Sequence, residues 1–465
     1  MKKNIWIYAI ALVVVMSMVL AACGGGAATE APSAEEPAGE EPAAEEPAGE
    51  EPSGEEAMEE KEPVVLTFIK IADELEAQAF DEMVAAFQQI EDGKWSHVSI
   101  EYDAKPFAEL FPAIETSVAT GAKVDLIQAD GPDVKHFAWN GVIQDLSDYF
   151  TEEELQQWFP QSVEDATYEG GFYGPPEVQS CQMLWYRTDY VEAAGIEIDP
   201  DVSLTYGPDG TGLPVWQKLT VDEDGDGNPE VFGFQNNGPF WFDYLNRIPA
   251  RTNGVPGSPT YEGVSEDGLT HTGYFDTDEA IEAYQFDQDL FYEYGVRSIE
   301  PPPNAMLAGF SAMFINQDLV VGIQRDQFPD VEIDAAAPPY WQTPMCQTGS
   351  WHYGISTTTE HFEETLAFVK YASSDEGAAF IWKYKNQFPA NINFLATVEE
   401  YQTYPRSLMA EFFVEFGKSR IVSPGYTEYN ALFGQFYQAL VSGGDVEELT
   451  REYAQLMDEA MAKYK

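Results

Sequence analysis

Val64-Val65-Leu66-Thr67-Phe68-Ile69 is an apolar run with the length and composition of a buried β-strand. Residues 76–90 follow with apolar side chains at helical spacing, and residues 98–102 are typical of a second strand. A second helical pattern over 107–120 leads to a third strand at 124–127. Because strands alternate with helices, the sequence predicts an α/β fold with a parallel sheet covered by helices.

Polar side chains follow the first and third of these strands. They are Asp73 and Glu74 after the first strand, and Gln128 and Asp130 after the third. Ligands of such sheets bind outside the carboxyl ends of the strands, so these side chains are candidates for a binding site.

The later part of the chain has a different character. Residues 196–275 are rich in Gly, Pro, Asp and Asn, with aromatic side chains scattered among them. Helical spacing then dominates over 360–384, 406–416, 429–442 and 446–464, which predicts a helical C-terminal region.

The composition excludes several classes of protein. The 465 residues include 23 Lys or Arg and 81 Asp or Glu, a formal net charge of −58, so nucleic acid is not expected as a partner. A hydrophobic fraction of 44% is ample for packed cores. With only three cysteines, the chain is not a disulfide-scaffold protein.

The first 23 residues have the architecture of an export signal. Lys2 and Lys3 precede an apolar run over 5–19, and Leu20-Ala21-Ala22-Cys23 closes the segment. This ending resembles the bacterial lipobox, which predicts a lipoprotein signal peptide over 1–23 with lipidation at Cys23. The alternative is an ordinary secretory signal with an incidental cysteine.

Residues 24–62 form a low-complexity segment. Between residues 30 and 62 there are 14 Glu and one Lys, in a repeating Glu-Glu-Pro-Ala-Gly pattern. Such a segment cannot bury enough apolar area to offset the entropy of ordering. It predicts a disordered Glu/Pro-rich tether between the membrane and the folded part.

Several short segments occur in the order seen in one protein family. They are the strand at 124–127 with 141–143 after it, Gly171-Phe172-Tyr173-Gly174-Pro175-Pro176, Leu184-Trp185-Tyr186-Arg187-Thr188-Asp189-Tyr190 with Gly195, 310–315 and 349–356. Together they resemble the bacterial extracellular solute-binding proteins of the large sugar-binding class that serve ABC importers. Arg187 stands where the family usually has Asn.

The resemblance implies a two-lobe, periplasmic-binding-protein-like fold of type II, with a hinge of crossing strands and the ligand in the cleft between the lobes. It places residues 64–175 plus about 305–345 in an N-lobe, and residues 176–304 plus about 346–465 in a C-lobe.

The function implied by the resemblance is capture of a carbohydrate, expected to be an oligosaccharide, and its delivery to a membrane permease. The expected partners are the carbohydrate and the ABC permease subunits, with no required cofactor and no enzymatic activity. The protein would be extracytoplasmic and would meet the membrane through its lipid anchor only.

Candidate ligand-binding residues lie in the segments that match the family. A sugar site needs aromatic faces for stacking and polar groups for hydroxyls. The candidates there are Asp73, Glu74, Asp130, Glu177, Gln179, Ser180, Gln317, Asp318 and Trp351, and Trp241, Tyr340 and Trp341 add further aromatic platforms. The alternatives are core packing for an aromatic side chain and simple surface exposure for an acid.

Two other functional classes stay open. A secreted carbohydrate-active enzyme would use the same aromatic and acidic side chains, although no nucleophile elbow, zinc-protease motif or phosphate-binding loop occurs. A related fold could instead bind a non-sugar solute such as a polyamine, because so acidic a chain offers many carboxylates.

Cys181 and Cys346 remain once Cys23 is assigned to lipidation. In the family fold both would lie on segments that cross between the lobes. The resemblance, together with export to an oxidising compartment, thus predicts a disulfide between them, the alternative being two separate buried thiols.

The segment 222–230 predicts a structural calcium site. Its oxygen-bearing side chains alternate as in the first half of an EF-hand loop, at Asp222, Asp224, Asp226, Asn228 and Glu230. Position 12 of the pattern is Gly233, so a complete EF-hand is excluded. The alternative is a solvated acidic turn.

Overall fold

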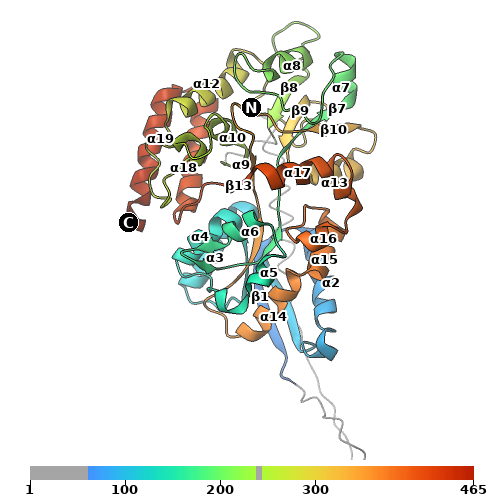
Figure 1. The fold of residues 1–465 in the computed structure, drawn as a ribbon, viewed down its shortest axis with the longest axis vertical. Helices are drawn as coiled ribbons and strands as arrows, with labels where there is room; N and C mark the ends of the chain where they lie inside the picture. The colour runs from blue at the N-terminus through green and yellow to red at the C-terminus, as the bar shows by residue number, and fades with distance from the viewer. Residues whose placement is uncertain (1–60, 237–242) are drawn as a thin grey trace, which may run out of the picture. The chain divides into compact units, whose positions relative to one another are not determined.

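The folded unit covers residues 61–465, and the computed structural model describes 61–236 and 243–465 of the chain (Figure 1). A five-stranded sheet forms the first lobe, in the order β2-β1-β3-β12-β6. Its strands are β1 (Val64–Ile71), β2 (Val98–Lys105), β3 (Leu126–Asp130), β6 (Pro176–Val178) and β12 (Trp351–Ile355). The three parallel strands predicted from the sequence are thereby confirmed.

Helices cover both faces of this sheet because β1 has apolar side chains on both sides. Phe68 faces the cluster that contains Phe80 and Phe87, whereas Ile69 faces the cluster that contains Ile114. The helices of the first lobe are α2 (Glu74–Phe87), α3 (Phe107–Ala119), α4 (Gly131–Trp139), α5 (Glu152–Leu155), α6 (Pro160–Asp165), α14 (Phe362–Ala372) and α15 (Asp375–Lys385).

A four-stranded sheet, in the order β10-β7-β9-β8, forms the second lobe, near the top of Figure 1. Its strands are β7 (Met183–Arg187), β8 (Phe232–Asn236), β9 (Ser311–Asn316) and β10 (Ile333–Ala336). The helices that accompany it are α7 (Thr188–Ala193), α8 (Gly212–Leu219), α9 (Asp243–Asn246), α10 (Ile248–Thr252), α11 (Pro259–Glu262), α12 (Asp278–Tyr292) and α13 (Leu319–Gln327). The short helix α16 (Ile392–Leu395) packs against α15 of the first lobe.

The sheet pairings correct the predicted allocation of segments to lobes. The 305–345 segment was expected in the N-lobe, but its strands β9 and β10 both pair with β7 in the second sheet. Conversely, β12 pairs with β3 and β6 in the first sheet, and α15 packs against α2. The chain therefore returns to the first lobe after residue 346, where the prediction kept it in the C-lobe.

Three helices complete the chain: α17 (Arg406–Phe416), α18 (Tyr426–Val441) and α19 (Val446–Met461). They confirm the predicted helical C-terminal region. Asp445 begins the last helix by accepting a hydrogen bond from the Glu448 amide at 2.9 Å. Helices α18 and α19 pack against α12 around Phe433, Phe436 and Met457.

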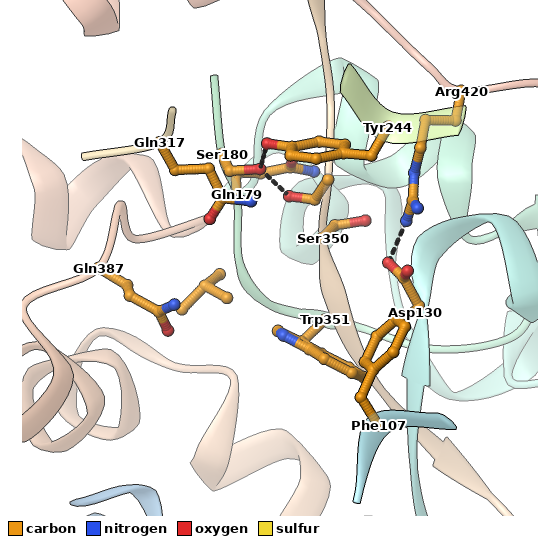
Figure 2. Close-up of a pocket in the computed structure, with 12 residues that line it drawn as sticks. Phe107, Asp130, Gln179, Ser180, Tyr244, Gln317, Ser350, Trp351, Gln387 and Arg420 are labelled. Carbon is orange, nitrogen blue, oxygen red and sulfur yellow. Dashed lines mark hydrogen bonds and ion pairs between the residues drawn. The ribbon is translucent and has the colours of Figure 1, made fainter. Parts of the chain in front are cut away.

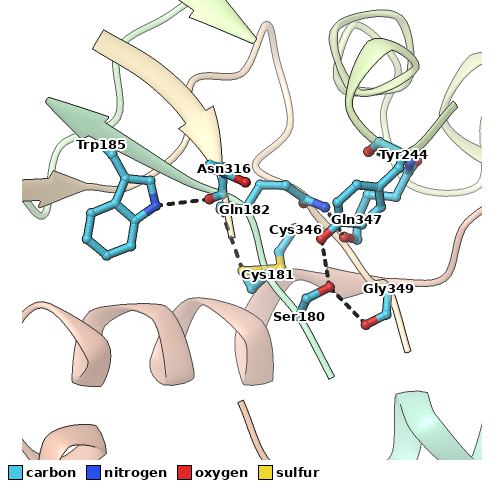
Figure 3. Close-up of a disulfide and its surroundings, with 9 residues drawn as sticks. All are labelled: Ser180, Cys181, Gln182, Trp185, Tyr244, Asn316, Cys346, Gln347 and Gly349. Carbon is cyan, nitrogen blue, oxygen red and sulfur yellow. Dashed lines mark hydrogen bonds between the residues drawn. A yellow bond between two sulfur atoms is a disulfide. The ribbon is translucent and has the colours of Figure 1, made fainter. Parts of the chain in front are cut away.

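Two crossing segments connect the sheets, 179–182 between β6 and β7 and 337–350 between β10 and β12. The second contains β11 (Cys346–Gln347), which pairs with β13 (Gly417–Lys418). A disulfide joins Cys181 to Cys346, whose Cα atoms are 5.4 Å apart (Figure 3). The Gln182 side chain also donates to the Gln347 carbonyl at 2.6 Å, so the two crossing segments are tied covalently and by hydrogen bonding.

Within the described ranges, no helix is both long enough and apolar enough to cross a bilayer.

Candidate ligand-binding site

A cavity of about 110 Å³ lies where the two lobes and the crossing segments meet (Figure 2). The first lobe contributes side chains from α3, the end of β3 and the start of β12, and the second lobe contributes from α9 and the end of β9. Its lining residues are Phe107, Asp130, Val178, Gln179, Ser180, Tyr244, Gln317, Gly349, Ser350, Trp351, Gln387 and Arg420.

Aromatic side chains of the first lobe form one wall. The ring centroid of Trp351 lies 6.1 Å from that of Phe107, edge to face, and 6.5 Å from that of Phe111, nearly parallel. Trp351 opens β12, at the point where the pairing with β6 shifts its register. Its side chain lines the cavity.

Amide and hydroxyl groups from the crossing segments form another wall. The Gln179 amide donates to Ser162 Oγ at 2.7 Å, but Gln179 Oε1 and Gln387 Oε1 are buried without a hydrogen-bond partner among the described residues. Ser180 Oγ is within 2.6 Å of Tyr244 Oη and donates to the Gly349 carbonyl at 2.8 Å. Buried acceptors without partners are costly, so this wall favours a ligand rich in donors.

An ion pair closes the opposite end of the cavity. Asp130 accepts a hydrogen bond from the Gly131 amide at 2.9 Å, which begins α4, and pairs with Arg420 of the segment that follows β13. Although burial opposes it, the Asp130 carboxylate holds the pKa of Arg420 well above its usual value. The pair links the carboxyl end of β3 to the C-terminal third of the chain.

Two neighbouring groups have shifted pKa values. Burial, together with the Asp130 carboxylate, raises the pKa of Asp133 to about 8. Burial lowers the pKa of His352 to about 4, although the Gly174 carbonyl acts in the opposite direction. His352 is thus neutral at pH 7, with Nε2 2.8 Å from Ser350 Oγ.

The structure brings half of the predicted binding residues to this cavity. These are Asp130, Gln179, Ser180, Gln317 and Trp351. Trp241 lies outside the described residues, and Tyr340 lines a different cavity. Trp341 packs edge to face on Phe286, with ring centroids 5.6 Å apart.

Four predicted residues do not line this cavity, and the carboxylates of three of them are engaged elsewhere. Asp73 accepts hydrogen bonds from the first amides of α2 and pairs with Lys385 at 3.2 Å, and Glu74 is exposed in the same turn. Glu177 is buried and accepts from the Gln128 amide at 3.0 Å. Asp318 is buried and accepts from Tyr401 Oη at 2.5 Å.

Sequence reasoning missed the lining residues that come from outside the recognised segments, chiefly Phe107, Tyr244, Gln387 and Arg420. Phe107 had a usable signal, because it opens a helix that follows a strand of the sheet. The other three come from helices and loops far along the chain, where nothing local marks them.

The predicted calcium loop is exposed. Carboxylate oxygens of Asp222, Asp224 and Asp226 lie within 4.8 Å of one another. Both oxygens of Asp222 accept backbone hydrogen bonds, from the Gly225 amide at 2.8 Å and the Gly227 amide at 2.9 Å. The donor set suits a hard cation, and the same hydrogen bonds hold a plain acidic turn.

Solved structures with this arrangement are sugar-binding proteins of type II, which confirms the predicted fold class. An ABC substrate-binding protein from Listeria monocytogenes in complex with cycloalternan is 18% identical with a TM-score of 0.71, covering 86% of this chain and 99% of that chain. The maltose/maltodextrin-binding domain from Bdellovibrio bacteriovorus bound to maltotriose is also 18% identical, with a TM-score of 0.70 over 86% of this chain and all of that chain.

Sequence comparisons give the family. Curated relatives from Brucella abortus and Brucella suis, whose names describe binding proteins, are 23% identical over 121 residues, which is 26% of this chain and 28% of theirs. The family model of the bacterial extracellular solute-binding proteins matches residues 72–379, about two thirds of the chain. The chain therefore belongs to the family of bacterial extracellular solute-binding proteins.

Proposed function

We propose that this protein captures a carbohydrate in the cavity between its lobes and delivers it to the permease of an ABC importer. The observation that carries the proposal is the pairing of an aromatic wall, Trp351 with Phe107, and a wall of unpartnered acceptors, Gln179 and Gln387. Sugar rings present apolar C–H faces that stack on aromatics, and their hydroxyls donate to such acceptors.

An oligosaccharide is the ligand class we favour. Structural neighbours were solved with cycloalternan, maltotriose, mannotriose and acarbose. Their identities of 16–18% establish a shared fold only, so the support for an oligosaccharide is by analogy.

Binding works by closure. A ligand that touches Trp351 of the first lobe and Gln317 of the second stabilises the arrangement in which both lobes contact it. The crossing segments 179–182 and 337–350 are the places where the backbone can bend. Ligand affinity is thereby converted into a population of the closed form.

The cavity disfavours the other two functional classes. Hydrolysis of a glycosidic bond normally uses two carboxyl groups, whereas Asp130 is the one carboxylate that the described residues contribute to the lining, and Arg420 pairs with it. A polyamine would need several free carboxylates and would meet the Arg420 guanidinium instead.

The location we propose is outside the cytoplasm, with Cys23 lipidated and residues 24–62 acting as the tether. Membership of an extracellular solute-binding family supports export. The signal, the cysteine and most of the tether lie outside the described residues, so anchoring rests on the sequence alone.

A thermal-shift screen tests the proposal, with maltotriose, mannotriose, cycloalternan and single sugars as probes. A ligand that binds the native state raises the melting temperature. Calorimetry should then give saturable binding that Gln387→Ala weakens and the exposed control Gln89→Ala does not. Release of shorter sugars from the bound probe would instead place the protein among the enzymes.

A further inference from the structure

A second cavity, of about 480 Å³, lies between the lobes and shares only Arg420 with the ligand cavity. Lys135 of α4 lines it from the first lobe, and Arg251 of α10 lines it from the second. Lys418, Ser419 and Arg420 line it from the segment that leads from β13 towards α18.

Lys135 is a buried cation that makes no direct ion pair among the described residues. The residue is only 7% exposed, and it makes no hydrogen bond or ion pair with any residue of the described ranges. Burial lowers the pKa of its ammonium group, while the Asp165 and Glu164 carboxylates act in the opposite direction. An anion in the cavity would compensate this charge directly.

Arg251 is buried as well, with 1% exposed. Its guanidinium donates to the Tyr261 carbonyl, Gln347 Oε1 and the Ser419 carbonyl, each at 2.9 Å. All three acceptors are neutral, and no described carboxylate lies within ion-pair distance. Burial and the neighbouring Arg247 lower the pKa of Arg251.

The unpaired charges are not explained by a shortage of acids. The chain has 81 acidic and 23 basic residues, and the other two cations of this cavity are paired, Lys418 with Glu262 at 2.9 Å and Arg420 with Asp130. An uncompensated buried charge is strongly destabilising. Two such charges around one cavity are typical of a site for an anion.

We propose that the second cavity binds a small oxyanion, of the phosphate, sulfate or carboxylate class, between Lys135 of the first lobe and Arg251 of the second. The exposed carboxylates Glu164 and Glu266 at its edge repel large polyanions and limit the site to a compact one. Because its ligands come from both lobes, the anion favours the arrangement in which the lobes are close together.

The test is a calorimetric titration of the sugar-free protein with inorganic phosphate, sulfate and malonate, at an ionic strength held constant with sodium chloride. Wild type is compared with Lys135→Met and with the control Lys123→Met, which removes the same charge from an exposed lysine paired with Glu360. We expect saturable binding of at least one anion to wild type and to Lys123→Met, weakened about tenfold or more in Lys135→Met.

Lys135→Arg is the variant that keeps the positive charge, and it should retain anion binding. This variant distinguishes loss of the charge from a packing effect. No saturable binding of any of the three anions to wild type overturns the proposal, and so does equal binding to wild type and Lys135→Met. If Lys135→Met does not fold, Lys135→Gln takes its place. Since no sugar is present, failure here leaves the proposed carbohydrate function untouched.

Discussion

Trp351 is the side chain whose loss should weaken carbohydrate binding most directly. Replacing it with alanine removes one stacking face, and we expect a loss of about 1 to 3 kcal/mol of binding free energy with little change in melting temperature. Calorimetry with the best sugar from the screen measures the loss. Trp139→Ala is the matched control, because Trp139 is 41% exposed and does not line the cavity; equal effects of the two changes would remove Trp351 from the site.

Glu177 should affect stability rather than binding. Burial and the Glu76 carboxylate raise its pKa from 4.5 to about 8. Between those two pH values the unfolded chain ionises and the folded chain does not, so wild-type stability falls as the pH rises through this window. Glu177→Gln stays neutral, and its melting temperature should therefore exceed that of wild type by a margin that grows from pH 4.5 to pH 8.

Thermal melts at several pH values measure this margin, and the sugar titration supplies the control. A margin that does not vary with pH would show that Glu177 is ionised in the folded protein. Reduced sugar affinity in Glu177→Gln would return the residue to the binding site.

Two of the predicted binding residues show how far the local sequence can predict which side chains line the cavity. Asp130 ends a strand of the first sheet and Asp73 follows another, and both side chains accept hydrogen bonds from the first amides of a helix. Asp130 reaches the cavity and Asp73 does not, because Lys385, 309 residues from Glu76 in the chain, draws the acids at the start of α2 into a buried network. Nothing in the sequence around Asp73 indicates that Lys385 is its partner.

The predicted calcium site can be tested on a single element, the 222–230 loop. If the loop binds calcium, millimolar Ca²⁺ should raise the melting temperature of wild type, because the ion neutralises three clustered carboxylates. Asp224→Asn should abolish the increase in melting temperature. Asp278→Asn should keep it, because Asp278 is an exposed acid in helix α12, outside the loop. Equal melting of wild type with Ca²⁺ and with chelator would leave an acidic turn.

The helices and strands that a local apolar pattern marks in the sequence were predictable. The alternation at 64–127 gave three parallel strands, and the helical spacing near the C-terminus gave α17, α18 and α19. The partners of β9 and β10 were not predictable, because strand pairing joins residues far apart in the chain. Met313, for example, lies opposite Tyr186, and neither segment carries a local mark of the other.

The disulfide between Cys181 and Cys346 should matter to the whole folded unit. It spans 165 residues of sequence, so removing it frees a long loop in the unfolded state. We expect Cys181→Ser to lower the free energy of unfolding by about 2 to 5 kcal/mol. Chemical denaturation measures the change, with reductant as the internal control: it should destabilise wild type and leave Cys181→Ser unaffected. Free alkylatable thiols at both positions in exported protein would contradict the bond.

The proposed lipid anchor at Cys23 is a prediction at the scale of the whole molecule. Cys23→Ala should block lipidation and release the protein from the membrane fraction, because the proposed acyl anchor is attached at this cysteine. Cys181→Ser is the matched control, since it also removes one thiol but should remain in the membrane fraction. Membrane retention of Cys23→Ala would refute the lipobox interpretation.

The position of the Cys181–Cys346 bond has a consequence for proteolysis. The bond closes a covalent ring that carries all four strands of the second sheet and the exposed 222–230 loop. A protease that cuts this loop would leave its two products joined, so the nicked chain would run as one species without reductant and as two fragments with it. A single cut in this exposed loop would therefore leave the residues on both sides of the ligand cavity covalently joined.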